Sequence, residues 1–225
     1  MNELLTHCGD PWWEEVFSLY AGCVSDASPL LRKLLVRERR QRLLRKSNHT
    51  SLIWAGQCLG TRPRVKQIAL REKIVDRLLK LLWKAGGRFE IDNEAKALAR
   101  IGGDRVRKNL LAMLMDRQAT VRVRLIAAAA IEKLKDQTVL PGLVAVLKDT
   151  HDDVKLRQTV ARALRTYKDQ TVLPDLVAVL KDTHDDVEVR QVVAQMLLDS
   201  EKKYIAVLYT LNILFALWLS KIRGK

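Results

Sequence analysis

The chain has 225 residues, is 48% hydrophobic and carries a formal net charge of +14. The apolar content is enough for a packed core and excludes a wholly disordered protein, and the length fits one to two domains. Its three cysteines, Cys8, Cys23 and Cys58, form no Cys-x-x-Cys pattern, and the first residues do not resemble a secretory signal. These features exclude a disulfide-built secreted protein and favour a reducing, cytoplasmic location.

Residues 1–63 are expected to form a helical segment. Within residues 10–22 (DPWWEEVFSLYAG), large apolar side chains recur at helical spacing, namely Trp13, Val16, Phe17 and Tyr20. Ser28-Pro29 is a start signal for a further helix. That helix is expected to have an apolar side made of four leucines, Leu30, Leu31, Leu34 and Leu35.

Most of the net positive charge lies in residues 29–66, where eleven basic residues meet one acidic residue, Glu38. Like charges at this density make a long uninterrupted helix costly without an anionic partner. Two interpretations stay open: a solvated helix face or loop, and a site for nucleic-acid phosphates or another anionic surface. Aromatic residues for base stacking are sparse here, and Trp54 beyond the run is expected in the core. The candidate anion-binding residues, within 32–46, are Arg37, Arg39, Arg40, Arg42, Arg45 and Lys46.

A repeat of 33 residues dominates the second half of the chain. Residues 135–167 and 168–200 are identical at 24 of 33 aligned positions. A weaker match in the same register adds a unit at 102–134, which makes three repeats over 102–200, and a degenerate unit at 64–101. A fixed period of this length is typical of stacked helix pairs. We therefore predict an all-α fold, an α-solenoid preceded by the helical segment.

Each unit is expected to contain two helices. In the first near-identical copy, apolar spacing predicts helices at about 139–148 and 154–167. Pro141 falls in the first turn of the former, where a missing N–H costs little. Ala161 is small enough to let neighbouring helices approach closely. One such pair buries too little surface to be stable alone, so we expect the units to stack.

The units share an Asp, a Val five positions later, and then Arg, Ala and Leu or Ile. The three sets are Asp116, Val121, Arg124, Ala128, Ile131; Asp149, Val154, Arg157, Ala161, Leu164; and Asp182, Val187, Arg190, Ala194, Leu197. This pattern resembles HEAT-like repeats, of the short kind also found in phycobilisome (PBS) lyase-type proteins. The resemblance implies an α-solenoid in which the recurring Arg and Asp side chains bridge neighbouring repeats. It does not imply lyase activity.

The blocks DPWWEEVFSLYAG at 10–22 and LIWAGQCLG at 52–60 carry a second resemblance. Residues 8–62 are similar to the helical segment that follows the nucleotide-binding core in NACHT-type signalling NTPases of bacteria, members of the STAND class. The sequence contains no Gly-x-x-x-x-Gly-Lys-Ser/Thr loop, so nucleotide hydrolysis by this chain alone is not expected. The resemblance implies the C-terminal part of such an architecture, as a truncated gene, a split subunit or a stand-alone adaptor.

Two groups of residues have side chains that can bind metals. His151-Asp152-Asp153 and His184-Asp185-Asp186 recur at the unit period, but polar turns that cap helices explain them better. The spacings of the other group fit no zinc finger; it comprises His7, Cys8, Cys23, His49 and Cys58. We predict no metal, no cofactor, no catalytic residue and no enzymatic activity.

The exposed side of the second helices carries charges of both signs. A surface that tracks phosphates should stay positive along the array, so we expect this side to bind protein. The candidate partner-binding residues are Arg122, Lys155, Gln158, Arg162, Glu188 and Gln191.

An apolar C-terminal helix is predicted within residues 201–225. Residues 204–219 are apolar at 14 of 16 positions and have basic residues on both sides. As a helix they would be about 24 Å long, against a hydrocarbon core of about 30 Å. Burial in the array or in a dimer and anchoring to a membrane both stay open.

The leading hypothesis is a non-enzymatic protein-binding scaffold, related to the sensor end of NACHT-type signalling NTPases. Binding of nucleic acid or of an anionic surface through residues 32–46 is the first alternative. A chromophore-lyase-like activity follows from the repeat resemblance alone and is placed last, because a fold is a weak guide to chemistry.

Overall fold

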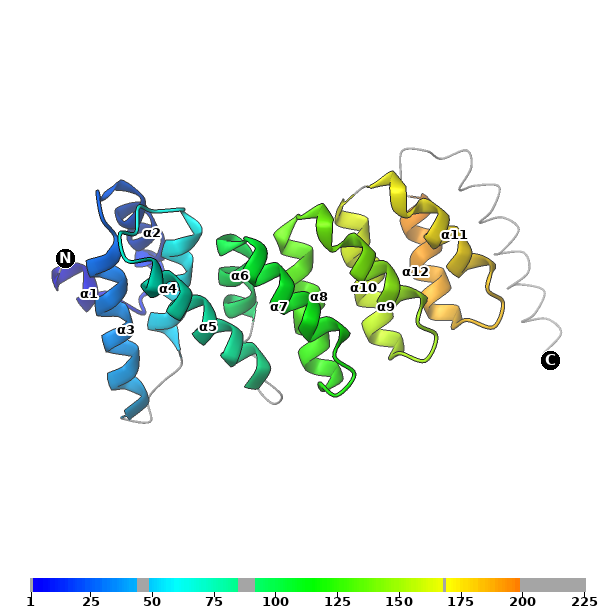
Figure 1. Ribbon diagram of the computed structural model, residues 1–225, viewed down its shortest axis with the longest axis horizontal. Coiled ribbons are helices and arrows are strands. Elements are labelled where there is room, and N and C mark those ends of the chain that lie inside the picture. The colour runs from blue at the N-terminus through cyan, green and yellow to red at the C-terminus, as the bar shows by residue number, and fades with distance from the viewer. Residues whose placement is uncertain (1, 44–48, 85–91, 168, 199–225) are drawn as a thin grey trace. The chain divides into compact units, whose positions relative to one another are not determined.

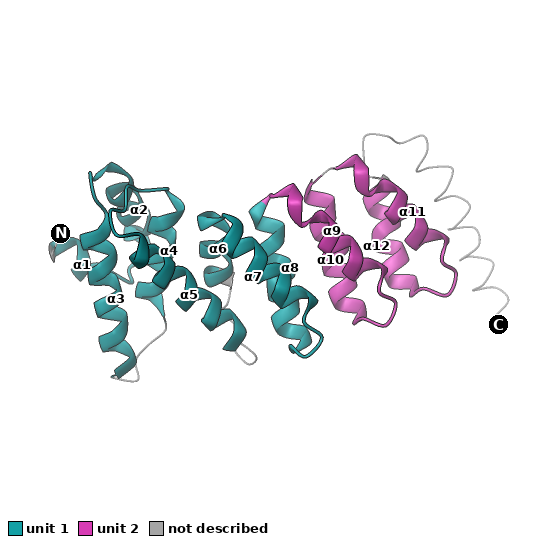
Figure 2. Ribbon diagram, in the orientation of Figure 1, with its two compact units in different colours: residues 1–134 teal, residues 135–225 magenta. Residues whose placement is uncertain are grey.

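The computed structural model describes residues 2–43, 49–84, 92–167 and 169–198 (Figure 1). These residues contain twelve α-helices and no strand, which confirms the prediction of an all-α fold. The chain divides into two units, residues 1–134 and 135–225 (Figure 2). Each unit is described by itself below.

Unit 1 consists of helices arranged largely as antiparallel hairpins. It begins with the short helix α1 (Asn2–Thr6), the 3-10 turn η1 (Pro11–Trp13) and α2 (Glu14–Cys23). The hairpins that follow are α3 (Ser28–Leu43) with α4 (Thr50–Gly60), α5 (Ile68–Lys84) with α6 (Asp92–Ile101), and α7 (Asp104–Met115) with α8 (Val121–Leu134).

The hairpins of unit 1 stack in two layers. The first helices contact one another in the order α3, α5, α7, and the second helices in the order α4, α6, α8. This is the packing expected of an α-solenoid. It begins earlier in the chain than the sequence repeat does, because the α3–α4 hairpin stacks on α5–α6 as a repeat would.

Helix α4 is the most deeply buried element of unit 1. It contacts α2, α3, α5 and α6, and every residue from Ser51 to Leu59 is buried. Trp54 is 5% exposed and packs edge-on against Phe17, which confirms the prediction that it lies in the core. Two glycines face α6: a Cβ on Gly60 would lie 2.7 Å from the Cβ of Arg100, and one on Gly56 would lie 3.0 Å from that of Ala97.

Helices α2 and α3 partly match the sequence-based expectations. The four leucines of α3 are buried as predicted. In α2, Phe17 and Ala21 are buried, whereas Val16 and Tyr20 are 40% and 36% exposed. The buried side of α2 therefore differs from the predicted apolar side, because α2 packs onto α4 through Phe17.

Helix α3 continues to Leu43 in spite of its many positive charges. The buried leucines hold it against the rest of unit 1. Its acidic residue Glu38 is 1% exposed, and the Glu38 carboxylate lies 2.8 Å from His49 Nδ1 and 4.0 Å from Arg42 Nε. A buried negative charge thus offsets part of the repulsion along the helix.

Unit 2 contains the two near-identical repeats. The first comprises the 3-10 turn η2 (Gln137–Val139), α9 (Leu140–Lys148) and α10 (Val154–Tyr167). The second comprises η3 (Gln170–Val172), α11 (Leu173–Lys181) and α12 (Val187–Leu198). The predicted helices at 139–148 and 154–167 are confirmed, as is the place of Pro141 in the first turn of α9.

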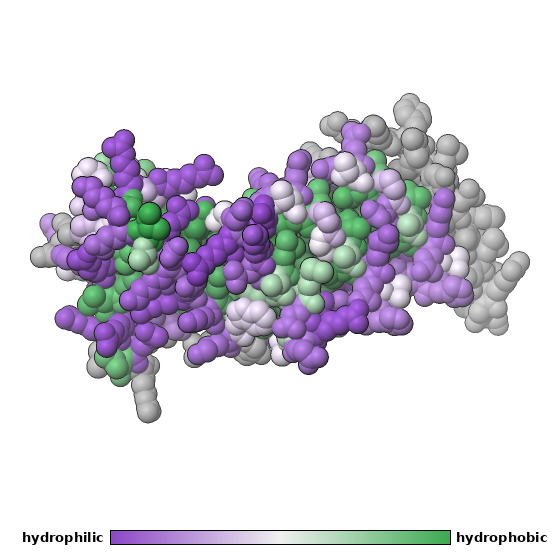
Figure 3. Space-filling view, in the orientation of Figure 1, coloured by the Kyte–Doolittle hydropathy of each residue, from purple (hydrophilic) through white to green (hydrophobic). Residues whose placement is uncertain are grey.

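The two repeats of unit 2 abut along both layers. Helix α9 contacts α11, and α10 contacts α12, so the expectation that they stack is confirmed. Ala161 and Ala194, at equivalent positions of α10 and α12, are 0% and 6% exposed. In the view of Figure 3, hydrophobic residues show between the hydrophilic side chains of this unit.

No helix within the described ranges is both long and apolar enough to cross a membrane. The apolar segment 204–219 lies outside the described residues.

Candidate functional site

The structure brings together five of the six candidate partner-binding residues on unit 2. Lys155, Gln158 and Arg162 follow one another along α10 at positions i, i+3 and i+7, which share one face of a helix. Glu188 and Gln191 hold the corresponding positions on α12. Lys155, Arg162, Glu188 and Gln191 are exposed, and Gln158 is half-buried.

A hydrogen bond joins the two helices across this face. The Gln158 Nε2 amide donates to Glu188 Oε2 over 2.8 Å. The bond fixes the α10 and α12 faces on the same side of the unit, and it occupies two of the candidate residues. Lys155, Arg162 and Gln191 are the side chains that remain directed to solvent. We call these five residues of α10 and α12 the second-helix face.

Arg122 is the sixth candidate, and it lies on α8 in unit 1. It is half-buried. It thus belongs to a different unit from the second-helix face.

A buried ion pair lies beneath the second-helix face. The Arg157 guanidinium donates to both carboxylate oxygens of Asp185, over 2.5 Å and 2.6 Å, and its Nε donates to the carbonyl of Leu147 over 2.9 Å. Arg157 is 1% exposed and Asp185 is 5% exposed. One side chain of α10 thus binds α9 of its own repeat and the turn of the next repeat, so it holds α9, α10 and the second repeat together.

The expected bridge between Arg and Asp residues exists, but the acidic partner differs from the expected one. The bridge to Arg157 is made by Asp185, whereas the recurring Asp149 and Asp182 each accept a hydrogen bond in their own turn, from the backbone N–H of His151 and His184. Sequence reasoning had placed Asp185 in a capping turn. Asp185 follows Arg157 by 28 residues, which is nearly one repeat length. This interval is the signal that could have identified Asp185 as the partner.

The environment of Asp185 shifts its titration. Burial acts to raise the pKa of this carboxyl group. Hydrogen bonds from Arg157 and from the backbone N–H of Asp186, with the positive charges of Arg157 and Arg190, outweigh burial and lower the pKa below its ordinary value. Asp185 is therefore ionised at neutral pH and forms a true ion pair with Arg157.

The two His-Asp-Asp turns cap helices, as predicted. Asp153 accepts from the backbone N–H of Leu156 over 3.0 Å at the start of α10, and Asp186 accepts from that of Glu188 over 2.8 Å at the start of α12. No group of three or more His, Cys, Asp or Glu side chains that could hold a metal is found among the described residues.

The other group of metal-type residues is dispersed over unit 1. Cys58 is buried and donates to the Phe17 carbonyl, Cys8 lies 3.6 Å from the Ser51 hydroxyl, and Cys23 is exposed. Burial raises the pKa of Cys58 to about 12, and it also raises the pKa of Cys8. Neither thiol has the thiolate character that a nucleophile or a metal ligand needs at neutral pH.

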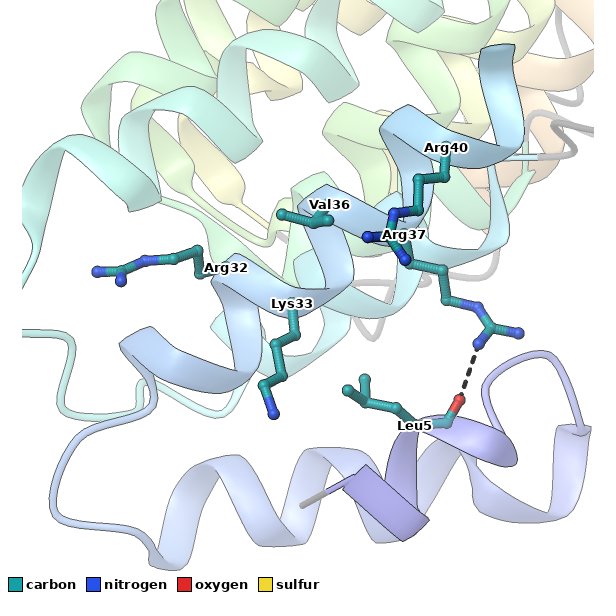
Figure 4. A pocket seen from close by; sticks show the side chains of 6 residues that line it. All are labelled: Leu5, Arg32, Lys33, Val36, Arg37 and Arg40. Atoms are coloured by element: carbon teal, nitrogen blue, oxygen red, sulfur yellow. Dashed lines mark hydrogen bonds between the residues drawn. The ribbon is translucent and has the colours of Figure 1, made fainter. Parts of the chain in front are cut away.

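The basic cluster of α3 is divided between two sides of the helix. On one side, a depression of about 410 Å³ lies between α1 and α3 (Figure 4). It is lined by Leu5, Arg32, Lys33, Val36, Arg37 and Arg40. Arg37 is anchored there, because its guanidinium donates to the carbonyls of Leu5 and Cys8 over 3.0 Å and 3.3 Å.

The positive charges of Arg39 and Arg42 act instead on Arg77 of α5. Burial lowers the pKa of Arg77, and repulsion from Arg42 and Arg39 lowers it further against the attraction of Glu38. Of the six predicted anion-binding residues, Arg37 and Arg40 therefore line the depression, and Arg39 and Arg42 are not among its lining residues. Arg45 and Lys46 lie outside the described residues. Arg32 and Lys33 line the depression but were not among the six.

The comparisons with known proteins bear on the second half of the chain. Residues 115–198 match the family model of HEAT repeats. The match covers α8 to α12, including both near-identical repeats and the second-helix face, so this region consists of HEAT-like repeats. No curated protein matches the chain.

Proposed function

We propose that this chain is a non-enzymatic scaffold that binds a protein partner through the second-helix face. HEAT repeats generally act as protein-interaction scaffolds. The observation that carries the proposal is the polar face of α10 and α12, which is joined by the Gln158–Glu188 hydrogen bond and supported from below by the Arg157–Asp185 ion pair.

The supported face is suited to binding because its geometry exists before a partner arrives. A preformed surface loses little conformational freedom on association, so less of the interaction free energy is spent on ordering. Lys155 and Arg162 provide two cations, and Gln191 provides an amide that can both donate and accept hydrogen bonds. This combination favours a partner that presents acidic side chains and backbone amides.

The test is a comparison of two charge-reversal variants. Lys155→Glu with Arg162→Glu reverses both cations of the second-helix face, and the matched control Arg71→Glu with Lys108→Glu makes the same change in net charge at exposed sites of α5 and α7. Proteins retained from a lysate of the source cells are quantified by mass spectrometry. We expect a protein that the wild type and the control retain and the first variant loses. Equal retention by both variants would refute the assignment.

Anion binding by α3 is a second candidate function. The observation in its favour is the α1–α3 depression, where four cations surround the apolar side chains of Leu5 and Val36. Arg37 is held in place by two backbone carbonyls, so its charge is already positioned for an anion.

Binding to heparin and to duplex DNA at several salt concentrations tests this second candidate. If phosphates bind there, Arg32→Glu with Arg40→Glu should lower the slope of log affinity against log salt by about 2. The control, Arg71→Glu with Lys108→Glu, makes the same change in net charge on exposed sites of α5 and α7. Equal slopes for the two variants would exclude the α1–α3 depression.

We further propose that the chain is related to the sensor end of NACHT-type signalling NTPases. The support is the resemblance of residues 8–62, followed along the chain by HEAT-like repeats. Co-purification with a P-loop ATPase encoded beside this chain, lost when the second-helix face is reversed, would support it. A neighbouring coding region without any ATPase core would argue against it.

A further inference from the structure

Large apolar side chains gather on the outer side of α2. Trp12, in the turn η1 that leads into this helix, is 88% exposed, and Leu19 is 66% exposed. Val16 is 40% exposed, and Cys23 is an exposed free cysteine. We call these four residues the α2 stripe. The opposite side of the helix is the buried one, with Phe17 and Ala21, so the α2 stripe is not part of the core.

The spacing of the α2 stripe is that of a helix-pairing seam. The three members on α2, Val16, Leu19 and Cys23, follow at intervals of three and four residues, which is the alternation that places side chains against a partner helix. Trp12 precedes them in the turn η1. Contiguous exposed apolar residues on a soluble protein mark an interaction site. Tryptophan is also among the residues most enriched at the energetic centres of interfaces.

The charges beside the α2 stripe are of opposite sign at its two ends. Glu15 is exposed near the N-terminal end of the helix. At the C-terminal end, Thr61 lies against Gly22, since a Cβ on Gly22 would be 3.8 Å from Thr61 Oγ1. Arg62 follows Thr61 and is exposed. Gly22 comes seven residues after Glu15, so Thr61 lies on the flank of the stripe that begins with Glu15, and Arg62 is the next residue along the chain.

We propose that a second copy of this chain packs antiparallel on the α2 stripe. A two-fold axis perpendicular to two antiparallel helices reverses their ends and keeps each flank opposite itself. Glu15 of each copy then lies beside Arg62 of the other. Trp12 faces Cys23 of the partner, and Val16 faces Leu19. The stripe is thus complementary to itself in both apolar groups and charges, which is what an interface between identical copies requires.

The first test is sedimentation of the full chain over a range of concentrations. Leu19→Glu is expected to weaken self-association by about tenfold or more, whereas Ile68→Glu, at an equally exposed site on α5 (71%), should leave it unchanged. Since Leu19 is exposed, circular dichroism should show an unaltered fold. A monomeric wild type, or association that Leu19→Glu does not weaken, would overturn the proposal. The second result would mean that another surface or residues 204–219 drive assembly.

A charge swap tests the predicted flank contact. Glu15→Arg alone should weaken the dimer, because two arginines then meet. Adding Arg62→Glu should restore it, because the pair is then re-formed in reverse. Failure of the double variant to recover would overturn the antiparallel arrangement.

Disulfide trapping tests the register. Trp12→Cys is made in a Cys8→Ser background and oxidised at high protein concentration, and the linked peptides are mapped by mass spectrometry. The antiparallel arrangement predicts a bond between residue 12 of one copy and Cys23 of the other. A parallel arrangement would instead join Cys23 to Cys23, and that product, or none, would overturn the proposal.

Discussion

At the Arg157–Asp185 pair, two opposite charges are held almost entirely out of water. Removing one partner of a buried pair leaves the other charge uncompensated. We therefore expect Asp185→Asn to lower the free energy of unfolding by about 3 kcal/mol, as measured by urea denaturation.

The Lys148–Asp175 pair is a matched control on the same unit. It also joins the two repeats, over 2.9 Å, but its side chains are 49% and 37% exposed. Water screens such a pair, so Asp175→Asn should cost less than about 1 kcal/mol. Similar losses for Asp175→Asn and Asp185→Asn would show that burial does not set the strength of these contacts.

The Arg157–Asp185 pair makes the free energy of unfolding depend on pH. Because the pKa of Asp185 is lower in the folded than in the unfolded chain, its contribution is complete above the ordinary aspartate pKa of about 3.9. The contribution is lost as the pH falls from there through the lowered folded value. Urea titrations between pH 7 and pH 3 should show a smaller acid-induced loss of stability for Asp185→Asn than for the wild type. Parallel pH profiles would assign acid sensitivity to other carboxylates.

At the scale of helices, Gly56 and Gly60 set how closely α4 and α6 approach. A methyl group on Gly60 would meet the Arg100 Cβ at 2.7 Å, which forces the helices apart. We expect Gly60→Ala to lower the free energy of unfolding by about 1–3 kcal/mol. Gly22→Ala in α2 is the control, since its nearest neighbour would be 3.8 Å away and alanine favours a helix by about 0.5–1 kcal/mol. Thermal or urea denaturation should thus give opposite signs for the two variants.

The helices of unit 2 could be predicted because two signals agree there. Apolar spacing gave the helices at 139–148 and 154–167, and the near-duplicate at 168–200 showed that the pair is a structural unit. The stacking of the α3–α4 hairpin could not be predicted, because residues 28–60 have no detectable likeness to the repeat. Their packing depends on how leucines and glycines of separate segments meet, which spacing within one segment does not reveal.

The candidate sites could be predicted only in part for a similar reason. The exposed positions of α10 and α12 follow from helical spacing, so the sequence could place these side chains on one face of each helix, while their role in binding stays a prediction. The division of the basic cluster depends on Arg37 reaching the carbonyls of Leu5 and Cys8, some 30 residues away in sequence. Backbone carbonyls carry no signature in the sequence, so such an anchor is visible only in the structure.

At the scale of the whole molecule, stability should be local. Each hairpin of a solenoid contacts only its neighbours, so a destabilising substitution should loosen its own surroundings first. We expect Asp185→Asn to speed amide hydrogen exchange in α10, α11 and α12 and to leave α4 and α6 unchanged. Gly60→Ala should have the reverse effect. A uniform increase along the chain for either variant would indicate that the whole molecule opens as one cooperative unit.

The Arg157–Asp185 ion pair between repeats also bears on how the number of repeats in such a protein can change. Asp152 precedes Arg157 by five residues, and Asp185 precedes Arg190 by the same interval. Each of the two near-identical segments therefore carries an Asp and an Arg at the positions that form the Asp185–Arg157 bridge. An in-frame tandem duplication creates a further matched junction at once, without compensating mutations, so array length can change in a single genetic event.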